Sequence, residues 1–138
     1  MLILNPRIVT FGSHTWPDIA AIAIDRSPHR TVEDWSDLGP FAVLADVPEQ
    51  KVRVTISQEV ERDDGSVPRP GESETLSFCT SPTASDAGRR RFSCTAVVLD
   101  VRHELSLRKG AVRTITLAAV SEDGASDPIE MSDASGGV

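Results

Sequence analysis

The sequence predicts a mainly β fold, an antiparallel β-sandwich or barrel-like domain. Two long segments in the C-terminal third, Arg91 to Leu105 and Lys109 to Ser121, alternate apolar and polar residues as strands do. Both exceed the usual strand length of about five or six residues, which is more typical of a sheet that builds an assembly than of a compact enzyme. The 138 residues suit one domain. We assign it to residues 1–131, with 132–138 as a flexible tail.

The N-terminal half contains three predicted strands. Leu2 to Phe11 and Asp18 to Asp25 have strand composition, and Pro6 suggests that the first lies at a sheet edge or bulge. Lys51 to Glu61 has the cleanest alternation, because its apolar residues all share one face. These residues are Val52, Val54, Ile56 and Val60.

One short helix is predicted between Thr31 and Pro40. Thr31 can cap its N-terminus, acidic residues follow in the first turn, and Gly39-Pro40 ends it. Trp35 and Leu38 then share one face of the helix, which would dock on the sheet.

An extended hairpin loop is predicted from Arg62 to Glu72, between the strand at Lys51 to Glu61 and another strand at Glu74 to Thr80. The loop contains two glycines, two prolines and alternating charge. It is either idle surface or an arm that reaches a neighbouring subunit. Its charged residues are therefore candidates for contact between subunits: Arg62, Asp63, Asp64 and Arg69.

The strand from Arg91 to Leu105 changes phase near its middle. Its first apolar residues, from Phe92 to Val98, fall on one face, and a second set, from Val97 to Leu105, falls on the other. A β-bulge or a covered middle section explains this overlap.

The charge of the chain argues against wrapping of nucleic acid. The formal net charge is −7, from 21 acidic and 14 basic residues, and nucleic-acid binding depends on basic residues that neutralise phosphates. The sharpest basic cluster is Arg89-Arg90-Arg91. The residues directly before it in the sequence include no aromatic residue suited to base stacking. We expect these arginines to pair with carboxylates of the same or a neighbouring chain, with solvated surface charge as the alternative.

No residue set points to catalysis, a cofactor or a metal. His14, His29 and His103 are isolated imidazoles without a ligand-like spacing. The cysteines, Cys79 and Cys94, show no metal-binding spacing either. They can be free thiols in the core, an intrachain disulfide across a hairpin, or an interchain disulfide between subunits. We expect a protein that is not an enzyme and has no cofactor.

Membrane insertion and secretion are not indicated by the sequence. No apolar run approaches the roughly 18 residues that a spanning helix needs. The apolar stretch that opens the chain is too short for a signal peptide, so we expect the chain to start its life in the cytoplasm.

The order of these elements resembles the tail tube proteins of long-tailed bacteriophages, whose fold is shared with the tubes of contractile injection systems. The resemblance is carried by Gly110 to Ser121 and by the hairpin from Val52 to Phe78. It implies a structural virion protein, assembled in the host cytoplasm, whose copies form hexameric rings. The rings would stack into a hollow tube that conducts DNA without specific binding.

The resemblance also implies partners and leaves alternatives. The partners would be further copies of this chain, with sheath, baseplate and tape-measure proteins. One alternative is another ring component of a phage tail, such as a baseplate, terminator or adaptor protein. A second alternative is a monomeric β-sandwich that serves as a binding module.

Overall fold

The computed structural model describes residues 9–60, 68–80, 90–106 and 110–133, and all regular structure in these ranges is β-strand. The strands form one antiparallel sheet in the order β2-β1-β5-β6-β7-β4-β3, and β8 pairs with β6. The prediction of a mainly β, antiparallel domain is therefore confirmed. The strands are β1 Val9–Phe11, β2 His14–Trp16, β3 Ile19–Trp35, β4 Ala42–Val60, β5 Ser73–Thr80, β6 Arg90–Ser106, β7 Gly110–Val120 and β8 Glu130–Asp133.

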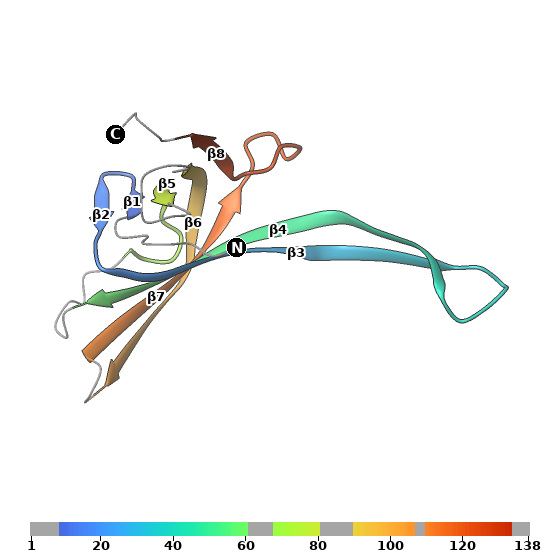
Figure 1. Cartoon of the computed structure of the whole chain (residues 1–138), viewed down its shortest axis with the longest axis horizontal. Coiled ribbons are helices and arrows are strands. Elements are labelled where there is room, and N and C mark those ends of the chain that lie inside the picture. The colour runs from blue at the N-terminus through green and yellow to red at the C-terminus, as the bar shows by residue number, and fades with distance from the viewer. Residues whose placement is uncertain (1–8, 61–67, 81–89, 107–109, 134–138) are drawn as a thin grey trace.

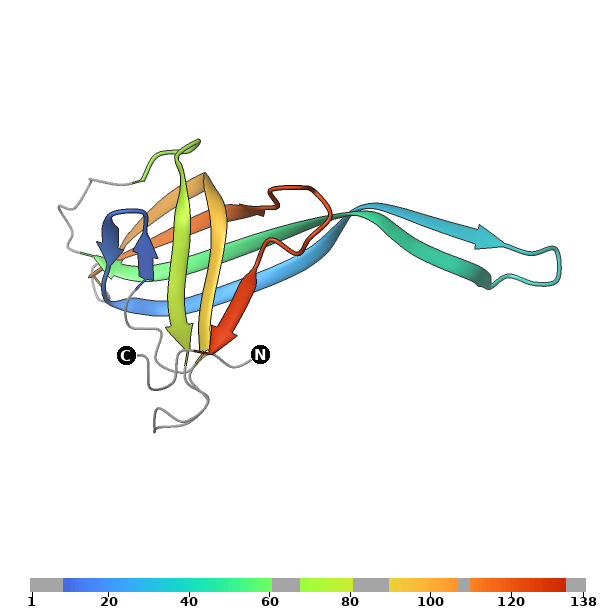
Figure 2. The ribbon, with the colours of Figure 1, turned by 90° about the horizontal axis from the view of Figure 1, so that it is seen from above.

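The sheet curls around its own apolar face without closing, because β2 and β3 lie at its two ends (Figures 1 and 2). Two aromatic pairs fill part of the interior. The rings of Phe11 and Trp16 stack at 5.0 Å, and those of Phe78 and Phe92 at 5.3 Å. The largest fully buried side chains come from five strands: Phe11, Ile56, Leu76, Ile115, Leu117, Val9, Val54 and Val98.

Strict alternation in β4 and β7 forms the centre of this core. Val54 pairs with Leu117 and Ile56 with Ile115 across the two strands, and all four side chains are buried. Paired residues of antiparallel strands project to the same face, so these side chains pack directly on one another. The predicted alternation of Lys51 to Glu61 is confirmed for Val52, Val54 and Ile56.

The predicted irregularity in β6 is a bulge at Leu99. The register with β7 shifts between Val98 and Asp100. Before the shift Val98 is buried, and after it Val101 packs against the core. The extra residue reverses the phase of the strand, so that both Val98 and Val101 face the core.

The predicted helix is wrong. Residues 31–35 continue β3, and the rest of the segment forms the end of a hairpin with β4, where Glu33 pairs with Ala45. The residues that suggested a helix start instead order this turn. The backbone N–H of Trp35 donates to Asp34 Oδ1 at 3.0 Å and that of Leu38 to Ser36 Oγ at 3.3 Å. Short polar side chains cap turns as readily as helices.

The predicted hairpin between residues 51–61 and 74–80 is also wrong. β4 lies between β7 and β3, whereas β5 lies between β1 and β6. Both edges of β4 are therefore occupied by other strands. The extended hairpin of this protein is formed by β3 and β4, which leave the curled sheet together as an arm (Figure 2). Most of the loop at 62–72, and residues 1–8 of the predicted first strand, lie outside the described residues.

The C-terminal strand β8 includes Ser132 and Asp133, which the sequence assigned to the tail. They pair with Arg91 and Arg90 of β6. Hydrogen bonding to an existing strand explains why regular structure extends to this point.

Core and arm should respond differently to loss of apolar side chains. We expect Ile115→Ala to lower the free energy of unfolding by about 2–4 kcal/mol, because it leaves a cavity in a fully buried site. Leu38→Ala, at the end of the arm, should change it by less than about 0.5 kcal/mol. Denaturant titration measures both values, and equal losses would contradict the assignment of Ile115 to the core.

Candidate functional site

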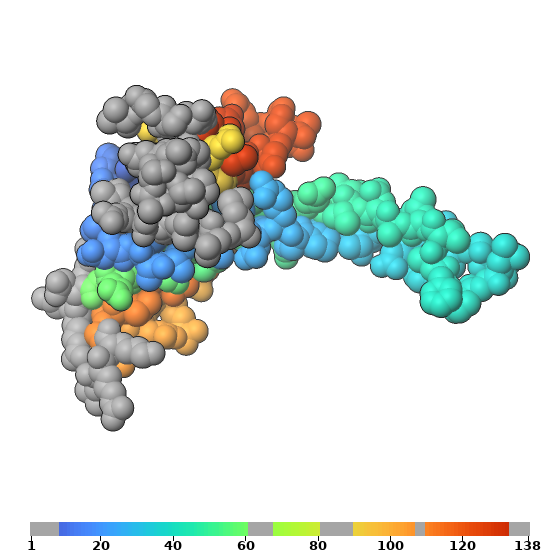
Figure 3. All heavy atoms as spheres, viewed as in Figure 1, coloured from blue at the N-terminus to red at the C-terminus, as the bar shows by residue number. Residues whose placement is uncertain are grey.

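The arm presents large apolar side chains to solvent. We define the arm tip as residues 31–48, which lie far from the body of the molecule (Figure 3). Leu38 is 97% exposed, Phe41 83% and Trp35 53%. Contiguous apolar surface of this kind marks an interaction site in soluble proteins. The other exposed apolar residues of the tip are Val32, Val43, Leu44 and Val47.

Both faces of the arm carry apolar groups. Leu44 pairs with Asp34 on one face and Ala45 pairs with Glu33 on the other, and Val43 and Val47 lie where the register shifts. A two-stranded ribbon has no second layer to cover either face, and an isolated hairpin has marginal stability in water. These side chains therefore contribute little to the stability of the isolated chain. They are suited to burial against another surface.

The same tip is acidic. Between residues 31 and 48 the chain has no Lys, Arg or His. A surface that combines apolar and acidic groups is complementary to an apolar site with basic residues at its rim. The acidic residues of the tip are Glu33, Asp34, Asp37 and Asp46.

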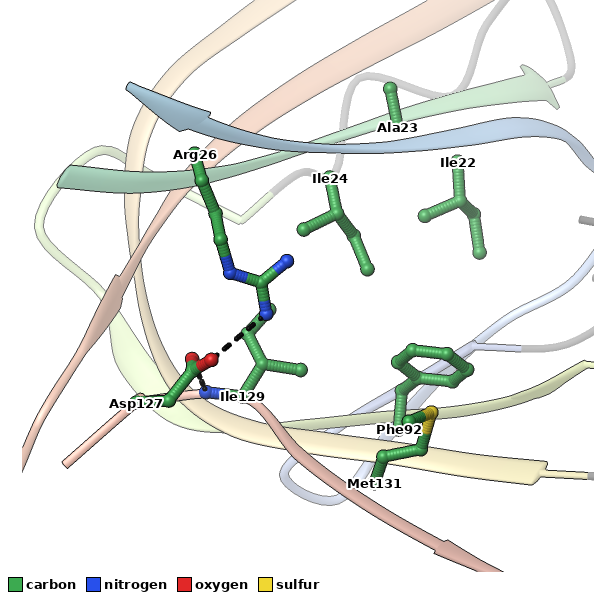
Figure 4. A pocket seen from close by; sticks show the side chains of 8 residues that line it. All are labelled: Ile22, Ala23, Ile24, Arg26, Phe92, Asp127, Ile129 and Met131. Carbon is green, nitrogen blue, oxygen red and sulfur yellow. Dashed lines mark hydrogen bonds and ion pairs between the residues drawn. The ribbon is translucent and has the colours of Figure 1, made fainter. Parts of the chain in front are cut away.

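A pocket of about 550 Å³ lies at the base of the arm, inside the curl of the sheet (Figure 4). Ile22 and Ile24 approach it from β3, and Phe92 and Met131 approach it from β6 and β8. Arg26 supplies the basic group of the lining. Asp127 supplies an acidic group, and the other six lining residues are apolar: Ile22, Ala23, Ile24, Phe92, Ile129 and Met131.

The segment 121–129 completes one side of this pocket. Val120 of β7 pairs with Thr95 of β6, and Glu130 of β8 pairs with Ser93 of β6. β7 and β8 therefore lie one after the other along the same edge of β6. The segment between them is an excursion out of the sheet. It brings Asp127 and Ile129 to the pocket.

Asp123 orders the first half of the excursion. Its Oδ1 accepts the N–H groups of Ala125 and Ser126, each at 2.9 Å, and the hydroxyl of Ser121 at 3.0 Å. These bonds favour the ionised carboxylate and hold the pKa of Asp123 well below its usual range.

Asp127 orders the second half and connects it to the arm. Oδ1 accepts the Ile129 N–H at 3.0 Å, and Oδ2 accepts from Arg26 Nη2 at 3.1 Å. The Ile129 bond, with help from Arg26, lowers the pKa of Asp127. Both side chains of the ion pair are about half exposed, so it contributes at most about 1 kcal/mol. Its role is to fix where the excursion meets β3.

A buried polar pair supports the opposite end of β4. Gln58 Nε2 donates to the Pro17 carbonyl at 2.7 Å, and Arg113 Nε donates to Gln58 Oε1 at 3.2 Å. Sequence analysis did not identify this pair. Gln58 is in phase with Val54 and Ile56, and Arg113 with Ile115, so the alternation itself places both inward.

The predicted contact residues fall into two groups. Arg62, Asp63, Asp64 and Arg89 lie outside the described residues. Arg69, Arg90 and Arg91 are exposed, and the last two begin β6. Arg90 lies on the same face of β6 as the pocket residue Phe92, because the two are separated by one residue along the strand. The arm tip, which the sequence assigned to a docked helix, was not among the candidates.

The two cysteines are free thiols. Cys79 pairs in register with Arg91 and Cys94 with Leu76, so they are offset along β5 and β6 and project to opposite faces. This geometry does not allow an intrachain disulfide. Burial raises the pKa of the Cys94 thiol to about 11, which makes it unreactive at neutral pH. An interchain bridge through Cys79 stays a prediction.

Among the described residues, no group of three or more His, Cys, Asp or Glu side chains is arranged to hold a metal ion. The described part of the chain also contains no helix long and apolar enough to cross a membrane. No protein-family model matches the chain, and no characterised protein matches it significantly.

The excursion should make stability depend on pH in the acid range. The pKa values of Asp123 and Asp127 are lowered in the folded chain, so their stabilisation is present above the ordinary Asp pKa of about 3.9 and is lost as the pH falls below it. We expect the double variant Asp123→Asn, Asp127→Asn to lose less thermal stability than the unmodified protein between pH 6 and pH 3. The exposed Glu122→Gln variant is the control. An equal loss of thermal stability between pH 6 and pH 3 in the unmodified protein, the double variant and the control would contradict the prediction.

Proposed function

We propose that the protein is a structural virion component that assembles into hexameric rings, stacked as a hollow tail tube that conducts DNA. The observation that carries the proposal is the β3–β4 arm, because its tip carries seven of the eleven exposed large apolar residues in the described part of the chain. Proteins that act alone rarely keep such a surface. Repeated contacts between copies would cover it.

The charge of the tip favours contact between unlike surfaces. Two tips placed against each other would bring acidic groups together, which opposes symmetric pairing. A tip that binds a different surface of the next copy forms a head-to-tail contact. Such contacts close into rings or extend into filaments, depending on the rotation between copies.

The open sheet supports the same conclusion. Among the described strands, β3 forms one end of the strand order and β2 the other, so each has an edge without a neighbour there. Addition of a neighbouring strand satisfies the backbone groups of such an edge. In a ring, the sheets of adjacent copies would join edge to edge.

The acidic composition suits a passage for DNA. Each copy has a formal net charge of −7, and a wall built from many copies would repel phosphates. DNA would then pass through the tube without being held. Sheath, baseplate and tape-measure proteins are the further partners in this proposal.

Electron microscopy of the purified protein at high concentration tests the proposal directly. Stacked hollow tubes are the expected result. Closed rings that do not stack would favour another tail ring component, such as a baseplate, terminator or adaptor protein. A protein that stays monomeric would contradict assembly and favour a binding module.

Shortening the arm should abolish assembly and preserve the fold. Pro28 pairs with Gln50, so residues 29–49 can be replaced by Asn-Gly, which forms a two-residue hairpin turn. We expect circular dichroism typical of β structure and a cooperative unfolding transition, with no rings or tubes. The matched control is Leu105→Ser, which removes an apolar residue that is 68% exposed outside the arm and should assemble normally. Tubes formed by the shortened protein would refute the role of the arm.

A further inference from the structure

We propose that the pocket between β3 and β8 receives the arm tip of a second copy of this chain. The inference rests on the proposed assembly function and names the surface that accepts the arm. It makes every copy both a donor, through residues 31–48, and an acceptor, through the pocket.

The pocket has the size and chemistry for this occupant. Its volume of about 550 Å³ lies within the range of roughly 300–1,000 Å³ that is typical of ligand sites in proteins. The apolar residues of its lining, among them Ile24, Phe92 and Met131, can pack against the exposed Leu38 and Phe41 of the tip. Met131 is 57% exposed in the single chain, so the pocket is accessible from outside.

The lining holds one basic and one acidic residue, so the free donors of two arginines, and not a net charge of the pocket, favour an acidic tip. Arg26 meets Asp127 through Nη2, and a guanidinium has five N–H donors, so it can bind a second carboxylate. Arg90 is exposed on the same face of β6 as Phe92. A tip that carries Asp37 beside Leu38 and has no basic residue would bring carboxylates to these arginines.

The tip of the same chain cannot fill its own pocket. Ile24 of the pocket and Trp35 of the tip lie on the same strand, β3. A strand rises about 3.3 Å per residue, which separates the two positions by roughly 35 Å. The arm points away from the body in both views of the ribbon (Figures 1 and 2). The occupant must therefore come from another copy.

Disulfide trapping tests the contact between the arm tip and the pocket. The cysteines replace exposed residues, whose loss the fold tolerates. One protein carries Leu38→Cys and a second carries Met131→Cys, both in a Cys79→Ser, Cys94→Ala background. The two proteins are mixed, assembled and oxidised, and the same sample is inspected by electron microscopy. The matched control replaces the acceptor by Leu105→Cys, which is exposed near the far end of β6. We expect a crosslinked heterodimer on a non-reducing gel with Met131→Cys and none with Leu105→Cys.

The outcomes separate this inference from the proposed function. Rings or tubes with the specific crosslink support both. Rings or tubes without it, or with equal crosslinking to the control, overturn the pocket and leave assembly standing. Crosslinked dimers without rings or tubes support the contact and contradict the tube. If neither assembly nor crosslinking occurs in this mixture while the unmodified protein also stays monomeric, both are refuted.

A second variant tests the contact without new cysteines. Met131→Glu places a carboxylate at the mouth of the pocket, where it should repel the acidic tip and raise the protein concentration needed for assembly at least about tenfold. Met131→Leu keeps the apolar lining and should assemble as the unmodified protein does. Because Met131 is more than half exposed, the thermal midpoints of both variants should match the parent. Unchanged assembly of Met131→Glu would overturn the inference.

Discussion

The pairing of β3 with β4 is the constraint on which the rest of the structure depends. At one end, β4 lies between β3 and β7, and its side chains Val54 and Ile56 form the centre of the core. At the other end, the two strands pair with each other and with no further strand in the described ranges. One continuous hairpin thus joins a packed interior to an exposed tip. Burial at the base holds the direction of the arm, which a loop of the same length could not do.

The excursion at 121–129 links this hairpin to the rest of the sheet. It interrupts what would be one long strand along β6 and places Asp127 against Arg26 of β3. The excursion and β8 form one side of the pocket, and β3 forms another. Hydrogen bonds to Asp123 hold its shape in place of regular pairing. The pocket therefore depends on local turn chemistry as well as on the sheet.

The alternation of apolar and polar residues predicts where most of the strands lie. It does not predict which strands are neighbours in the sheet. Residues such as Val52 and Ile115 belong to short alternating patterns that predict a strand. Around Leu99, apolar residues occur on both faces of the strand, and this predicts the bulge. The order of the strands depends on contacts between distant segments, so β4 was wrongly paired with β5. The arm tip was misassigned because Thr31, Asp34 and Gly39 suit a helix and a turn equally well. Only cross-strand pairing with residues 42–46 decides between them.

The arm also explains why an acidic chain can keep apolar surface and remain suited to assembly. Acidic side chains on the tip favour hydration of the free arm and disfavour contact between two tips. They leave an apolar surface with arginine nearby as the favourable partner. In the proposed assembly, donor and acceptor are different surfaces of one chain, so each contact would leave another pair of surfaces available until a ring closes. Local negative charge would thus direct apolar attraction toward an ordered assembly.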